Sequence, residues 1–197
     1  MSNTPWRTRS ACRILAAGLL SVKSRGDLMS RSKTLLLLLP WLLAVTASSP
    51  AQPVQPCSDS AYRQFDFWLG EWSVHKPDGT VGGTNSIKSE YGGCVLHERY
   101  TTPGGYQGES LNTFDAARKV WHQTWVDNSG MLLLLEGRLT DRHMVLEGQT
   151  QGPDGATTKH RITWTPNPDG TVRQKWESTD AKGQWNVAFD GLYKKKL

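Results

Sequence analysis

Turn signals recur every eight to fourteen residues or so from Glu71 to the end of the chain. Each is a short run rich in Gly, Pro, Asn or Asp, residues that provide the preset or positive φ of tight reversals. They stand at 77–79, 92–93, 103–105, 115–118, 127–130, 140–142, 152–155, 167–170 and 180–183. The segments between them are too short for long helices. They alternate apolar and polar residues and are rich in Val, Ile, Thr, Trp and Tyr, which is typical of β-strands.

This pattern predicts ten strands, at 71–76, 82–90, 94–102, 106–114, 119–127, 130–139, 143–151, 157–165, 171–179 and 184–194. Short hairpin connections between them favour an antiparallel meander. Closing the meander would remove its exposed edges, so we predict an all-β, up-and-down barrel of about ten strands. A sandwich is the alternative, although its crossovers usually need longer connections. The stretch from Phe65 to Gly70 is predicted to form one short helical turn that closes one end of the barrel.

Alternation also predicts which side chains face the barrel interior. A shift of one residue in register would invert each inward set. The inward sets are Trp121, Gln123 and Trp125; His160, Ile162 and Trp164; Val172, Gln174 and Trp176; and Trp185, Val187, Phe189 and Tyr193. The run from Met131 to Leu135 is apolar on both faces, which predicts a covered outer face and a homodimer formed through it.

The chain begins with segments that do not resemble the strand-rich part. An apolar run at 34–47 follows Arg31 and Lys33 and precedes small residues, which is the form of a signal peptide. Its length of about fourteen residues is short of the ~20 of a membrane-spanning helix. Because Met29 opens this pattern, we expect 1–28 to be an over-long N-terminal extension and 29–51 a signal peptide. A linker at 52–61 and a barrel domain at 62–197 would follow.

Export would change the interpretation of the charge. The whole chain carries +5, but residues 1–51 hold seven of its 23 basic residues and one of its 18 acidic residues. The 16 basic and 17 acidic residues that remain give −1. A neutral domain without a basic stripe argues against a nucleic-acid partner. We therefore predict a periplasmic or secreted protein without a stable membrane anchor after cleavage, the alternative being an uncleaved anchor.

Two cysteines, Cys57 and Cys94, remain after the predicted cleavage. An even pair in an oxidising compartment predicts a disulfide, with two free thiols as the alternative.

Common catalytic and metal-binding motifs are not found in the sequence. It has no C-x-x-C, H-E-x-x-H or Walker motif, and its five histidines are scattered over five predicted strands. Neither a metal site nor a catalytic motif is therefore expected.

Tryptophan is the remaining signal, because seven of the nine lie in the predicted barrel domain. Aromatic walls with a few polar groups are typical of small-ligand cavities, whereas plain packing of the interior is the alternative. We predict a site for a small apolar or aromatic molecule, bound without catalysis. Its residues would be Trp121, Gln123, Trp125, His160, Trp164, Gln174 and Trp176. An alternative is a hydrolase or isomerase that uses Glu98 and His160 as acid and base.

Two motifs resemble one protein family. The run FDFWLGEW from Phe65 to Trp72 is similar to the opening of the secreted domain of unknown function 1579, and the stretch from Trp176 to Tyr193 resembles its end. The resemblance covers roughly 62–195 and implies a lipocalin-like (calycin) barrel of no established reaction. It also implies structural roles for Trp68, Gly70 and Trp72, with Trp72 at the barrel base and Lys194 lying over it by a cation–π contact.

The same resemblance bears on cofactors. Haem-binding relatives, the nitrobindins, carry G-x-W-x-G-x-G and a His near the C-terminus. Here Ser73, Val74 and His75 follow Trp72, and no His follows His160. We therefore expect no cofactor.

Overall fold

The computed structural model describes residues 55–196. The predicted extension 1–28 and signal peptide 29–51 lie outside the described residues, as does the start of the predicted linker. A 3-10 helix, η1 (Ser60–Arg63), begins inside the predicted linker 52–61, so the end of that linker belongs to the folded domain. Within 55–196, no helix has the length and apolar character needed to cross a membrane.

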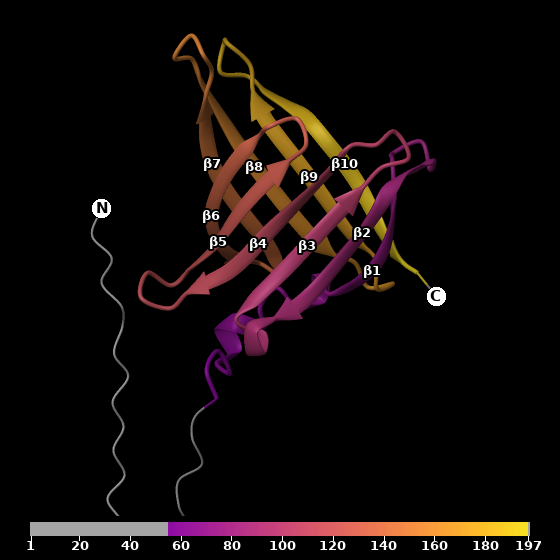
Figure 1. Cartoon of the computed structure of the whole chain (residues 1–197), viewed down its shortest axis with the longest axis vertical. Helices are drawn as coiled ribbons and strands as arrows, with labels where there is room; N and C mark the ends of the chain where they lie inside the picture. Colours follow the sequence, from indigo (N-terminus) through magenta and orange to yellow (C-terminus); the bar gives the residue numbers. More distant parts are fainter. Residues whose placement is uncertain (1–54, 197) are drawn as a thin grey trace, which may run out of the picture. The chain divides into compact units, whose positions relative to one another are not determined.

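Ten antiparallel strands form a closed barrel, in which each strand pairs with its neighbours in sequence and β1 pairs with β10. The predicted fold class is confirmed, and the strand bounds differ from the expected ones by a residue or two at most (Figure 1). The strands are β1 (Gly70–His75), β2 (Val81–Glu90), β3 (Val95–Thr101), β4 (Gln107–Asp115), β5 (Val120–Asp127), β6 (Leu132–Thr140), β7 (His143–Gln151), β8 (Thr157–Pro166), β9 (Val172–Thr179) and β10 (Trp185–Lys195).

Short helical turns lie at one end of the barrel, where Figure 1 shows them in purple and pink. The 3-10 helix η2 (Asp66–Trp68) is the predicted closing turn, in which Trp68 is buried in the barrel base and Phe67 is partly buried against the core. The ring of Phe65 stacks on Trp68 at 5.0 Å and contacts the edge of Trp164 at 5.1 Å and of Trp121 at 5.6 Å. This aromatic cluster seals one end of the barrel.

Trp72 continues the base on β1. Its indole Nε1 donates to the carbonyl of Trp68 over 2.9 Å, and its ring lies below a lysine ammonium at 5.5 Å. That lysine is Lys195, so the assignment of the cation to Lys194 is wrong by one residue. In the β1–β10 ladder Lys195 stands opposite Trp72, whereas Lys194 stands opposite Ser73.

The predicted disulfide joins Cys57 to Cys94 and is confirmed. It connects the segment before η1 to η3 (Tyr91–Gly93), the turn between β2 and β3. Nearby, the guanidinium of Arg63 donates to the carbonyl of Gly93. Together these contacts hold the N-terminal segment against the barrel base.

A β-bulge in β10 corrects part of the predicted interior. Val187 pairs with Glu177 and Phe189 pairs with Trp176, which makes Ala188 an extra residue. The extra residue inverts the alternation, so Trp185 (41% exposed) and Val187 (56% exposed) face outward, contrary to prediction. Beyond the bulge, Phe189 and Tyr193 face inward as expected.

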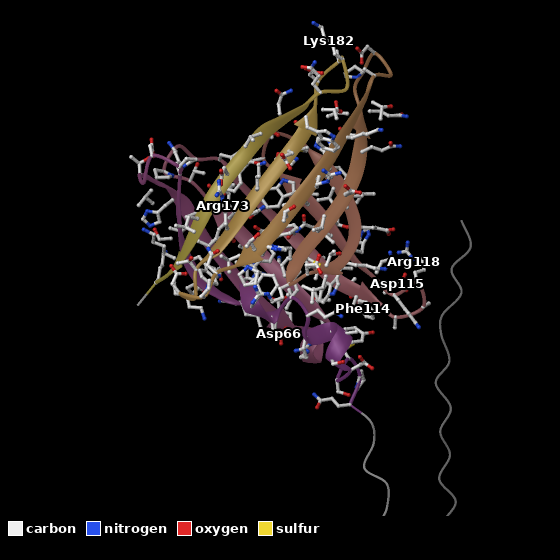
Figure 2. The ribbon with its side chains drawn as sticks, turned by 180° about the vertical axis from the view of Figure 1, so that it is seen from behind. Asp66, Phe114, Asp115, Arg118, Arg173 and Lys182 are labelled. Atoms are coloured by element: carbon white, nitrogen blue, oxygen red, sulfur yellow. A yellow bond between two sulfur atoms is a disulfide. The ribbon has the colours of Figure 1, made fainter. Side chains whose placement is uncertain are left out.

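The outer face of the barrel carries charged side chains in ladders. Arg173, seen on the outer face in Figure 2, pairs with Asp190 of β10, and Lys175 pairs with Glu177 at 2.7 Å. The run from Met131 to Leu135 alternates as a strand does, with Leu133 and Leu135 buried and Leu132 and Leu134 exposed. A homodimer through this outer face stays a prediction.

Candidate ligand-binding pocket

The barrel interior is layered from its closed end to its open end. Three strands repeat the same inward order of an apolar, a polar and an aromatic side chain. These are Leu96, Glu98 and Tyr100 on β3, Trp121, Gln123 and Trp125 on β5, and Val172, Gln174 and Trp176 on β9. The interior therefore has an apolar base, a polar middle layer and an aromatic layer toward the open end.

Glu98 is the centre of the polar layer, and only 3% of the residue is exposed. Its Oε1 accepts a hydrogen bond from Nδ2 of Asn85 at 2.7 Å, and its Oε2 accepts one from the hydroxyl of Ser110 at 2.6 Å. Asn85 and Ser110 come from β2 and β4, the two strands that flank β3. Each carboxylate oxygen thus accepts a hydrogen bond from a neighbouring strand.

The direction of the Ser110 bond follows from its other contacts. Its oxygen accepts from Nδ2 of Asn112 at 2.8 Å and from Nε2 of Gln123 at 3.4 Å. A hydroxyl has a single hydrogen, so that hydrogen is the one that points to Glu98. Gln123 also donates to Oδ1 of Asn112 at 2.7 Å, and the whole chain of donors is therefore directed at the carboxylate.

A second branch of the polar layer reaches β9 and β10. Asn85 donates to the hydroxyl of Tyr193 at 3.2 Å, and that hydroxyl donates to Oε1 of Gln174. Burial, followed by the charge of Glu98, raises the pKa of Tyr193 well above its ordinary value. Tyr193 consequently keeps its proton and remains a donor.

Burial raises the pKa of Glu98 to about 7, although the bonds from Ser110 and Asn85 act in the opposite direction. Desolvation disfavours the charged form, while donors to both oxygens favour it. Glu98 therefore titrates near neutral pH, inside the barrel.

A small pocket of about 60 Å³ lies between the polar and aromatic layers. Its polar lining comes from Glu98, Gln123, Gln174 and Tyr193. Its aromatic lining comes from Tyr100, Tyr106, Trp125, Trp176 and Phe189. Drug-sized ligands occupy pockets of about 300–1,000 Å³, and a water has roughly 30 Å³ in the liquid. The pocket as it stands has room for a chemical group of a few heavy atoms.

Asp127, at the end of β5, positions two of the aromatic rings. Its Oδ2 accepts from the indole Nε1 of Trp125 at 3.0 Å and from the hydroxyl of Tyr106 at 2.8 Å. Burial would raise the pKa of Asp127, but bonds from Ser129, Trp125 and Tyr106 outweigh it and hold the pKa below its ordinary value. An ionised Asp127 thus fixes the edge of the pocket.

His160 positions the ring of Trp176, which also lines the pocket. The indole Nε1 of Trp176 donates to Nδ1 of His160 at 3.1 Å, and Nε2 of His160 lies 2.9 Å from the hydroxyl of Thr150. Since Nδ1 accepts a hydrogen bond, His160 is neutral with its proton on Nε2. One ring nitrogen of His160 therefore holds Trp176, and the other is bonded to Thr150.

The structure divides the predicted binding residues into three groups. Gln123, Trp125, Gln174 and Trp176 line the pocket. Trp121 and Trp164 belong to the base cluster around Phe65, where Trp121 also donates to Gln64 at 3.2 Å. His160 contacts Trp176 instead of lining the pocket.

The predicted binding set did not include Tyr100, Tyr106, Phe189, Tyr193 and Glu98, which also line the pocket. Alternation within β3 would have placed Tyr100 on the same face as Glu98. Tyr106 opened the predicted strand 106–114, where alternation would have placed it on the same face as Ser110, although the observed β4 begins one residue later.

Glu98 and His160, the predicted acid and base, both face the interior. Each has its own hydrogen-bond partners, and among residues 55–196 no hydrogen bond joins the two side chains. The same described part contains no cluster of three or more His, Cys, Asp or Glu side chains placed to hold a metal ion.

Comparison with known families matches residues 67–195 to the family described as "Protein of unknown function (DUF1579)". No curated protein matches the chain. The matched residues begin within the base turn and end in β10, and so include all ten strands and the pocket.

Proposed function

This chain belongs to the DUF1579 family, and we propose that it is an exported β-barrel that binds a small apolar or aromatic molecule without transforming it. One observation carries the proposal, namely a pocket that is lined mainly by aromatic and apolar side chains and by the polar groups of a few residues, Glu98, Gln123, Gln174 and Tyr193. Binding sites for small molecules combine apolar walls with a few polar groups that orient the ligand. The base cluster already seals the other end of the barrel, so the aromatic side chains of the pocket are not needed to close it.

The pocket can grow toward the open end. Tyr100, Tyr106 and Phe189 line both the 60 Å³ pocket and an adjoining hollow of about 410 Å³. Their rings meet edge to face, with Tyr100 lying 6.3 Å from Tyr106 and 6.2 Å from Phe189. Movement of these rings would join the two spaces into a volume typical of small-ligand sites.

Export is part of the proposal. The apolar run at 34–47 has the form of a signal peptide. The Cys57–Cys94 disulfide is of the kind that persists in oxidising compartments such as the periplasm or the extracellular space. N-terminal sequencing of the protein from its host tests this point: we expect a mature chain that starts shortly after Ala47 or Ala51, and a chain that starts at Met1 or Met29 would contradict it.

We also propose that the barrel is of the lipocalin-like calycin type. The closed antiparallel meander, the helical turn at its base and the buried Trp72 beneath Lys195 support this relationship. A second protein of this family that bound a small molecule at the open end of its barrel would strengthen the assignment.

A titration with matched tryptophan variants tests binding. We would titrate the protein with indole, naphthalene and laurate by calorimetry, and identify any compound that copurifies from the host by mass spectrometry. Trp176→Leu, in the pocket, should weaken binding at least about tenfold, whereas Trp185→Leu, on the outer face, should not change it. The proposal fails if no probe binds and nothing copurifies, or if both variants behave alike.

A further inference from the structure

Glu98 is a buried acid that pairs with no cation in the part of the chain that the structure describes. Among residues 55–196, the ion pairs join side chains outside the barrel interior, and Glu98 is in none of them. The buried polar residues in the same part of the chain include no Lys or Arg. Buried charges are normally paired, since an unpaired one is costly in free energy. Glu98 therefore lacks the partner that a buried carboxylate usually has.

The neutral donors around Glu98 do not replace that partner. Asn85 and Ser110 donate to one oxygen each, and the donor chain from Gln123 through Asn112 ends at the same carboxylate. These bonds favour the ionised form, but they leave its negative charge in place. Each carboxylate oxygen has more than one acceptor position, so Glu98 retains the capacity to accept from a ligand.

The aromatic lining gives the pocket the same electrostatic preference. The faces of aromatic rings are negative and attract ammonium groups, and Trp is the strongest of them. Trp125 and Trp176 have their N–H groups bonded to Asp127 and His160, and they line the pocket together with Tyr100, Tyr106 and Phe189. A buried carboxylate in a pocket that five such aromatic residues line favours a cation over a neutral or anionic group.

The volumes of the pocket and of the adjoining hollow indicate how large a cationic group and an attached apolar body can be. A space of about 60 Å³ is close to twice the share of one water in the liquid, enough for an ammonium or methylammonium group. The adjoining hollow of about 410 Å³ has a mostly apolar lining, which includes Val74, Pro77 and Phe189, and would take a larger apolar body. His75, Lys76 and Asp190 also line this hollow.

We propose that the ligand is a small organic amine, whose protonated nitrogen binds Glu98 within the aromatic lining and whose apolar body occupies the adjoining hollow. This inference rests on the proposed binding function and specifies its ligand class. The ammonium donates to the carboxylate and completes the missing ion pair. The rings of Tyr100, Tyr106 and Phe189, which line both spaces, move aside to let the ligand extend from one space into the other.

Calorimetry with three probes of one shape tests the inference. Benzylamine, benzyl alcohol and benzoate carry a cation, a neutral group and an anion on the same ring. At pH 8 the amine should bind at least about tenfold more tightly than the alcohol, and benzoate should bind most weakly. Glu98→Gln should remove the preference for the amine, and Glu147→Gln, the same substitution on the exposed outer face of β7, should retain it.

A pH series on the unsubstituted protein gives a second measurement in case Glu98→Gln does not fold. Between pH 8 and pH 6 Glu98 takes up a proton, so affinity for the amine should fall severalfold while affinity for the alcohol stays constant. The other titratable groups near Glu98 are Tyr100 and Tyr193, which do not titrate in this range because burial raises the pKa of each, and His97 on the outer face of β3. His97→Gln should retain the fall in affinity, because the charge of His97 is the smallest of the influences on the pKa of Glu98.

The outcomes separate the two proposals. Equal affinity for the amine and the alcohol, or a preference unaffected by both Glu98→Gln and pH, overturns the amine inference and leaves the binding function standing. If none of the three probes binds, and the panel of neutral apolar probes does not bind either, the binding function itself is overturned.

Discussion

The indole Nε1 of Trp176 donates a hydrogen bond to Nδ1 of His160 over 3.1 Å, which requires that nitrogen to be unprotonated. The one polar atom of a pocket-lining tryptophan is thereby satisfied by a buried histidine. A role in catalysis would need this histidine to exchange its proton, but charging it would place a hydrogen on Nδ1 and break the bond to Trp176. The geometry assigns His160 to the support of the pocket wall.

Replacing His160 with Ala should therefore destabilise the fold. The change leaves the Trp176 N–H without its partner, which we expect to lower the free energy of unfolding by about 1–3 kcal/mol. Urea denaturation at pH 7.5 measures the loss. His143→Ala, which removes a half-buried histidine bonded to Thr165, serves as the control and should cost less. An equal loss in the two variants would contradict the assignment.

Protonation of His160 should weaken the fold below neutral pH. Burial lowers the pKa of His160 from 6.5, so the unfolded chain binds this proton more readily than the folded chain. The contribution of His160 to stability is therefore lost as the pH falls from about 7 through 6.5 and past the lowered value. NMR titration of the ring should show a pKa below 6.5 with the proton on Nε2 at pH 7, and a higher pKa would contradict the bond to Trp176.

Glu98 should act on stability in the opposite direction. Its pKa rises from 4.5 to about 7 in the folded chain, so the folded state binds more protons between these values and stability falls as the pH rises through them. The difference corresponds to about 3 kcal/mol at pH 8. His160 and the carboxyls with lowered pKa values contribute in the opposite direction, so the Glu98 contribution is measured as a difference between variants. Denaturation from pH 4 to pH 8 should show that the unsubstituted chain and Glu147→Gln lose stability, relative to Glu98→Gln, as the pH rises. Parallel pH profiles of all three proteins would contradict the assignment to Glu98.

The disulfide should contribute substantially to stability. Closing a loop across a separation of 37 residues stabilises a fold by about 4 kcal/mol in the chain-entropy model. The double substitution of Cys57 and Cys94 with Ser should lower the free energy of unfolding by an amount of that order. A reducing agent should destabilise the unsubstituted chain similarly and leave the double variant unchanged. If the reducing agent changes neither protein, the disulfide is not formed in solution.

Lys195 and Lys194 offer a matched pair for the cation–π contact at the base. Lys195→Met should cost about 0.5–1 kcal/mol of stability, because it removes the ammonium that lies 5.5 Å from the Trp72 ring. Lys194→Met, on the opposite face of the same strand, should change the stability little. Thermal denaturation of the two variants side by side measures the difference. A larger loss of stability in Lys194→Met than in Lys195→Met would restore the assignment to Lys194.

The sequence by itself determined the ten strands, their antiparallel order and the disulfide. Turn residues and period-two alternation are local properties, so they can be recognised without knowledge of any neighbouring strand. The pairing of Cys57 with Cys94 needed only the count of cysteines left after the predicted signal-peptide cleavage. The inward facing of Gln123, Gln174 and His160 followed from the same alternation.

Only the tertiary structure decided how deep each inward residue lies and where the alternation breaks. Trp121 and Trp125 share one face of β5, yet one contacts the base cluster and the other lines the pocket, because their distances from the closed end differ. The bulge at Ala188 turned Trp185 outward, since a bulge is a property of two paired strands and not of one. The surroundings of Glu98 were also decided by strand pairing, because its hydrogen-bond donors come from the neighbouring strands β2 and β4.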